Sequence, residues 1–126
     1  MVGGVIMEDM RKEQIEALET LVEFNDRLLK NIPILVKELS GARLEDTDKF
    51  ADNIIKAINW EIEVMNLTMD LLNESKERIV KDVANDKIIA LSEAINAKDD
   101  VKMAEAFEAL LPVLENLGVA AKEVIG

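Results

Sequence analysis

The stretch from Ile15 to Leu39 decides the fold and reads "IEALETLVEFNDRLLKNIPILVKEL". Its apolar side chains fall at heptad spacing into three adjacent rows: Ile15, Val22, Leu29 and Val36; Leu18, Asn25, Ile32 and Leu39; Leu21, Leu28 and Leu35. On a helical wheel these rows cover an arc of about 120°, the width with which a surface helix packs on a core. The pattern predicts a long amphipathic helix over about residues 8–39.

The same periodicity predicts three further helices, over about residues 47–73, 75–97 and 100–124, and no stretch alternates as a strand does. "SGARLEDTD" (40–48) supplies a glycine stop and capping residues, and "AKDD" (97–100) ends the third helix, with Asp99 or Asp100 as the next N-cap. The second boundary has two solutions. Ser75 begins a new helix after a turn near "NESK", which we favour, or the second helix continues to "AND" at 84–86.

Four amphipathic helices joined by short loops are typical of an up-down-up-down four-helix bundle. We therefore expect an all-α fold in which residues 1–126 form a single domain. Pro33 and Pro112 lie inside periodic stretches, on the outer faces of the first and last helices. A proline on the outer side bends a helix around the core, so both helices are expected to be kinked.

Composition excludes several classes of partner. The 26 acidic and 15 basic residues give a net charge of −11, and such a surface repels nucleic acid and anionic membranes. The chain has no cysteine, which suits a reducing compartment. The opening "MVGGVIM" has no basic segment and too few apolar residues for a signal peptide or a membrane span. We expect a cytoplasmic protein.

The chain also lacks the residues that most site chemistry requires. Without histidine or cysteine there can be no Glu-x-x-His di-iron site, no haem ligation by His and no Ser-His-Asp or Cys-His catalysis. Asp46, Asp48 and Asp52 are close together but lack the glycine and the terminal Glu of an EF-hand loop. We therefore predict no metal, no cofactor and no enzymatic activity.

Two polar residues fall on rows that face the core, Asn25 in the first helix and Glu61 in the second. A carboxylate there must find a partner or take up a proton, because an unpaired buried charge is costly. Glu61 has two interpretations. It belongs to a polar layer that fixes the packing register, or it contacts a ligand.

The second helix is more apolar than one core face requires, since its arc reaches about 200° on the wheel. One flank of this arc carries Ile55, Ile62 and Met69, and the other carries Trp60 and Leu67. Two neighbouring helices inside the bundle can cover the surplus, or it forms the interface of a homodimer or a groove for a partner helix. As a dimer interface, it should bind more tightly as salt screens the negative charge.

Two stretches, "AINWEIEVMNLTMDLL" (57–72) and "ALSEAINAKDDVKMAEAFEALLPVLENL" (90–117), resemble small acidic helical-bundle proteins of Gram-positive bacteria that have no assigned function. More remotely, the size, acidity and helix count are similar to those of flagellar export chaperones. The latter resemblance implies a partner helix held against the bundle, and it assigns no residue here.

The function predicted from the sequence is therefore protein–protein interaction without catalysis, either self-association or chaperone-like and adaptor-like binding of a partner helix. The predicted contact residues are those on the two flanks of the second helix: Ile55, Trp60, Ile62, Leu67 and Met69. The alternative is a small-molecule-binding bundle or a carboxylate-based enzyme centred on Glu61.

Overall fold

The computed structural model describes residues 2–126, with side chains from Met10 onward. Its helices are α1 (Val2–Leu39), α2 (Thr47–Leu67), α3 (Met69–Leu72), α4 (Lys81–Ala97) and α5 (Asp100–Ile125). Helix makes up 84% of the chain, and residues 2–126 contain no strand, so the all-α prediction is confirmed. Over these residues no helix is both long and apolar enough to cross a membrane.

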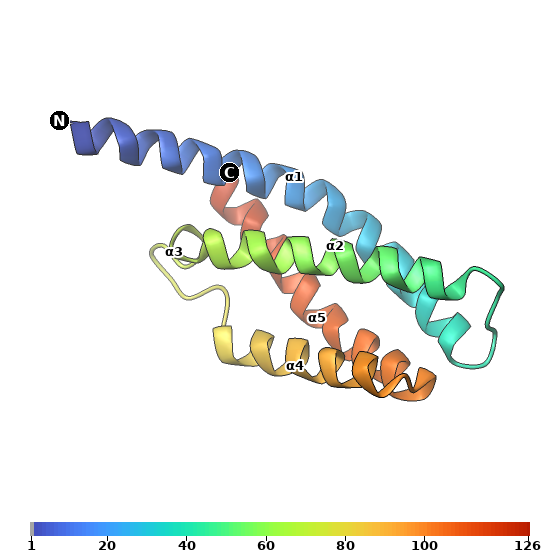
Figure 1. Cartoon of the computed structure of the whole chain (residues 1–126). Helices are drawn as coiled ribbons and strands as arrows, with labels where there is room; N and C mark the ends of the chain where they lie inside the picture. Colours follow the sequence, from blue (N-terminus) through green and yellow to red (C-terminus); the bar gives the residue numbers. More distant parts are fainter. Residues whose placement is uncertain (1) are drawn as a thin grey trace.

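The long helices pack in the order α2, α1, α5, α4 (Figure 1). α1 contacts α2 and α5, and α4 packs against α5. α1 and α2 run in opposite directions, and α5 crosses behind α2 toward the middle of α1 (Figure 1). The first turns of α1 extend past α3 and the C-terminus, so the end of α2 lies beside the N-terminal half of α1.

Buried side chains make two apolar clusters, one along the C-terminal part of α1 and one against its middle. The first gathers around Phe107 of α5 and includes Leu28 and Ile32 of α1 with Ile54 and Ile58 of α2. The members of the second are Leu18, Leu21, Val64, Met65, Leu71, Leu72, Ile79, Ala84, Leu117, Ala120 and Ala121. Both clusters take residues from α1, α2, α4 or its approach, and α5, so these four helices share one core.

The connection between α1 and α2 is fixed by a buried threonine. Thr47 is fully buried, and its hydroxyl donates to Glu38 Oε1 at 2.7 Å while accepting from Leu44 N at 2.8 Å. Gly41 has a φ of +116°, a conformation that side chains disfavour, and it ends α1 as the sequence predicts for a glycine stop. Asp99 caps α5 by accepting from Val101 N and Lys102 N.

Three helix boundaries differ from the sequence prediction. α1 already begins at Val2 rather than near residue 8. The third predicted helix begins at Lys81 rather than at Ser75, and Ser75 itself has a φ of 72°, outside the helical range.

The segment before α4 is irregular because one side chain binds its backbone. Asn73 Oδ1 accepts from Arg78 N at 2.9 Å and from Ile79 N at 2.8 Å, and Asn73 Nδ2 donates to Ile79 O at 3.2 Å. These bonds compete with helical ones and turn Ile79, only 3% exposed, into the second cluster. α2 also stops earlier than residue 73, because it breaks at Thr68 before the short α3.

Candidate functional site

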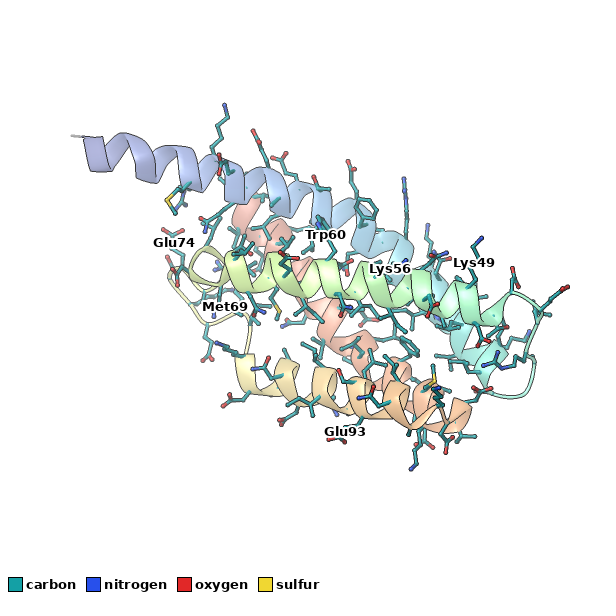
Figure 2. The ribbon with its side chains drawn as sticks, in the orientation of Figure 1. Lys49, Lys56, Trp60, Met69, Glu74 and Glu93 are labelled. Carbon is teal, nitrogen blue, oxygen red and sulfur yellow. The ribbon has the colours of Figure 1, made fainter. Side chains whose placement is uncertain are left out.

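The two flanks of α2 differ in how well they are covered. Ile55 and Ile62 are partly buried and pack against the first cluster, and Met69 packs in the same way against the second. On the other flank Trp60 is partly buried, but Leu67 is 70% exposed. Figure 2 shows Trp60 in the space between α1 and α2. Of the five contact residues predicted from the sequence, Leu67 is thus the most open to a partner.

α1 supplies apolar neighbours for Trp60 and Leu67 that the sequence analysis did not select. The ring centroids of Phe24 and Trp60 are 5.4 Å apart with the ring planes at 55°, an arrangement that is favourable for aromatic pairs. Met10 is 55% exposed and Phe24 44% exposed. Met10, Ala17 and Phe24 share one heptad row, a spacing that could have revealed them. We call Met10, Ala17, Phe24, Trp60 and Leu67 the α1–α2 strip.

The strip contains a hollow of about 240 Å³ at its Leu67 end. Its lining comes from two helices: Met10, Glu13, Gln14, Ala17, Val64, Leu67 and Thr68. Leu67 is the last residue of α2, and its carbonyl accepts from Gln14 Nε2 at 3.1 Å. This bond ties the end of α2 to α1 and holds the Leu67 side chain beside Met10.

Charges border the strip differently at its two ends. Glu13 lines the hollow beside Leu67, and Asp70, in α3, follows Leu67 by three residues. At the other end, the Arg27 guanidinium lies 5.8 Å from the centre of the Phe24 ring, and Lys56 precedes Trp60 by one turn. Figure 2 shows Lys56 and then Lys49 further along α2 from Trp60. The Leu67 end is therefore acidic and the Phe24 end basic.

The two polar residues that the sequence places on core-facing rows, Asn25 and Glu61, lie between the apolar clusters. On α1, Asn25 separates Leu21 of the second cluster from Leu28 of the first, and on α2 Glu61 separates Ile58 from Val64 in the same way. Thr47 bonds to Glu38 and Trp60 contacts Phe24, which puts Asn25 and Glu61 at the same level of the antiparallel pair. We call them the polar layer.

The polar layer is incompletely hydrogen-bonded. Asn25 is 2% exposed and donates to Leu114 O on α5 at 3.0 Å, but its Oδ1 has no protein partner. Glu61 is fully buried, and neither of its carboxyl oxygens has a protein partner. Burial raises the pKa of Glu61 to about 8, so near neutral pH the folded chain holds it mainly as the uncharged acid.

A second apolar hollow, of about 180 Å³, lies between α4 and α5. Its lining residues are Met65, Ile79, Val80, Val83, Ala84, Pro112, Val113 and Asn116. Glu61 lines neither this hollow nor the one at Leu67. Among the described side chains, no three or more acidic residues come together in a group that could hold a metal ion.

A family model described as a domain of unknown function (DUF8042) matches residues 16–119. The chain belongs to the DUF8042 family. No curated protein and no solved structure matches the chain. The DUF8042 match includes Phe24, Trp60, Leu67 and both residues of the polar layer, whereas Met10 lies before it. The strip is therefore built mostly from the DUF8042 domain and completed by the N-terminal part of α1.

Proposed function

We propose that this DUF8042 protein is a non-catalytic protein-interaction module and that the α1–α2 strip is its contact surface. The observation that carries the proposal is the 70% exposure of Leu67 beside the 55% exposure of Met10, in a hollow that both residues line. Burying side chains of this size is worth about 1.5–3 kcal/mol each, enough for a few of them to support association. Large apolar side chains gathered in one exposed strip are a common mark of a binding surface.

The alternative, a ligand site or carboxylate chemistry centred on Glu61, has less support. Its side chain is fully enclosed between the two apolar clusters and lines neither of the two hollows described above. A register-fixing polar layer accounts for this placement. Under that account, Glu61→Leu leaves partner binding intact and keeps or raises stability, because an apolar side chain of similar size replaces an unpaired carboxyl.

The proposal includes three expectations from the sequence. The four long helices act as an up-down-up-down bundle, with Pro33 and Pro112, both exposed within their helices, bending α1 and α5 around the core. The protein works in the cytoplasm. Its mode of action is self-association or the chaperone-like or adaptor-like binding of a partner helix on this surface.

Site-specific photo-crosslinking tests the contact surface without assuming a partner. A photoreactive residue replaces Leu67 in one version and Glu45, in the exposed α1–α2 loop, in the control. After irradiation in cells, position 67 should give one or a few defined protein adducts that position 45 lacks. The proposal fails if both positions give the same pattern of adducts.

A further inference from the structure

We infer that the partner on the α1–α2 strip is a second copy of this chain, bound antiparallel across a two-fold axis. This inference rests on the proposed function and adds the identity of the partner. It comes from the order of the charges that border the strip, since that order makes the strip complementary to itself.

On each side of the strip, one acidic and one basic residue lie 14 positions apart at the two ends of the border. On the α1 side these are Glu13 and Arg27, and on the other side they are Lys56 of α2 and Asp70 of the short α3, all exposed. Fourteen residues make nearly four whole turns, so Glu13 and Arg27 lie on nearly the same row of α1. Lys56 and Asp70 are separated by the break at Thr68, and Asp70 lies three residues beyond the exposed Leu67. Because α1 and α2 are antiparallel, Glu13 and Asp70 lie together at the Leu67 end, and Arg27 and Lys56 at the Phe24 end.

Consider a two-fold axis that lies in the plane of the contact and is perpendicular to the helices. It places the strips of two copies face to face and antiparallel. α1 then faces α1 of the other copy, and Glu13 of one copy meets Arg27 of the other. The same operation brings Asp70 of one copy to Lys56 of the other. Met10 and Leu67 of one copy approach Phe24 and Trp60 of the other, so apolar surface is covered in the same contact. A two-fold contact of this kind closes and gives a dimer rather than a fibre.

A foreign helix of a single charge sign fits the strip less well. A basic helix would be repelled by Arg27 and Lys56, and an acidic one by Glu13 and Asp70. The mixed border favours a partner with the reverse order of charges, and an antiparallel copy has that order.

The same symmetry brings one like-charged pair together. Glu63 is exposed and lies halfway between Lys56 and Asp70, so the axis passes beside it and Glu63 of each copy faces its counterpart. Removing this repulsion should strengthen the dimer. For binding of a foreign helix, Glu63 would meet no second Glu63, and its removal would not affect self-association.

Analytical ultracentrifugation of the full chain at 0.15 M salt tests the inference. Wild type should dimerise at micromolar concentrations, Leu67→Glu should weaken the dimer by ~tenfold or more, and Glu63→Gln should tighten it. Ile89→Glu is the matched control, since Ile89 is 54% exposed on α4 outside the strip and lines neither hollow, so its replacement should leave the dimer unchanged.

Charge reversal tests the antiparallel register. Glu13→Arg and Arg27→Glu should each weaken the dimer severalfold, because each puts like charges together twice per dimer. The double variant carrying both changes restores opposite pairs and should return to within about twofold of wild type. Circular dichroism should show unchanged helix content in all variants, since every position is exposed.

A wild type that stays monomeric up to about 100 µM overturns the inference, as does a double variant that fails to recover. A dimer that survives Leu67→Glu also overturns it. If wild type is monomeric while position 67 crosslinks to another protein, the proposed function stands, and only the inference that the partner is a second copy is wrong. If position 67 gives no specific adduct, the proposed function itself fails.

Discussion

Replacing Glu61 with glutamine should stabilise the protein near neutral pH and remove much of its pH dependence between pH 5 and 8. Burial without a partner for either oxygen raises the pKa of Glu61 from 4.5 to about 8. In the unfolded chain this carboxyl is exposed and ionises near 4.5. At pH 7 the folded protein therefore binds one proton that the unfolded chain has released.

The sign and size of the effect follow from this difference. Below about pH 4.5 Glu61 is protonated in both the folded and the unfolded chain, and its full contribution to the free energy of unfolding is present. As the pH rises toward about 8, where the folded state also loses the proton, each pH unit lowers the free energy of unfolding by about 1.4 kcal/mol. The loss is ~3 kcal/mol by pH 7, large against the usual ~5–15 kcal/mol of total stability.

Glutamine keeps the shape of Glu61 but does not ionise. The carboxyl oxygens of Glu61 have no protein partner, so the amide that replaces the carboxyl is also buried unpaired, which costs about 1 kcal/mol. Glu61→Gln should therefore equal or fall slightly below wild type at pH 5 and exceed it by about 2 kcal/mol at pH 7.

Urea unfolding followed by circular dichroism at pH 5, 6, 7 and 8 measures this. The window is favourable because the chain has no histidine, so no other side chain of ordinary pKa titrates within it. Glu93→Gln, at an exposed position on α4, removes the same charge and serves as the control (Figure 2). The free energy of unfolding of Glu93→Gln should change with pH as that of wild type does. If the free energy of unfolding of Glu61→Gln also follows wild type, Glu61 does not hold its proton in the folded state and the reasoning is wrong.

Two further substitutions test the packing around the polar layer and the segment before α4. A Cβ at Gly118 would overlap Asn25 Nδ2, so Gly118→Ala should destabilise by ~1–2 kcal/mol. In an Asn25→Ala background the same change should stabilise by up to ~1 kcal/mol, because alanine is the better helix former, and thermal unfolding of both pairs measures the reversal. Asn73→Ala removes three hydrogen bonds to Arg78 and Ile79 and should cost ~2–3 kcal/mol, measured against the exposed control Asn66→Ala.

Periodicity predicted the regular parts of this protein because burial on a helix repeats with the helical turn. The row of Leu18, Asn25 and Ile32 predicts one face of α1, and these three side chains are all buried in the structure. The same reasoning placed Glu61 on the core face of α2, because Ile54, Ile58 and Glu61 lie on one face of the helix. A rotation that exposed Glu61 would also expose the two isoleucines.

Periodicity could not predict the segment between α3 and α4. The row of Leu72 and Ile79 continues the helical spacing, and both side chains are buried, yet the backbone between them is not helical. What decides it is the Asn73 side chain, whose three bonds to residues 78 and 79 form only once the chain has turned. A wheel records which face a residue occupies but not which backbone groups a side chain will bind.

The wide apolar arc of α2 is explained by what α1 offers opposite it. Opposite Trp60 stands Phe24, a ring large enough to cover much of the indole. Opposite Leu67 stand Ala17, which is too short to cover it, and Gln14, whose amide is engaged with the Leu67 carbonyl. One flank residue of α2 is therefore paired within the chain and the other is left open. The pattern of α2 alone does not predict this difference in exposure, because the exposure of Trp60 and Leu67 depends on which residues of α1 lie at the same level.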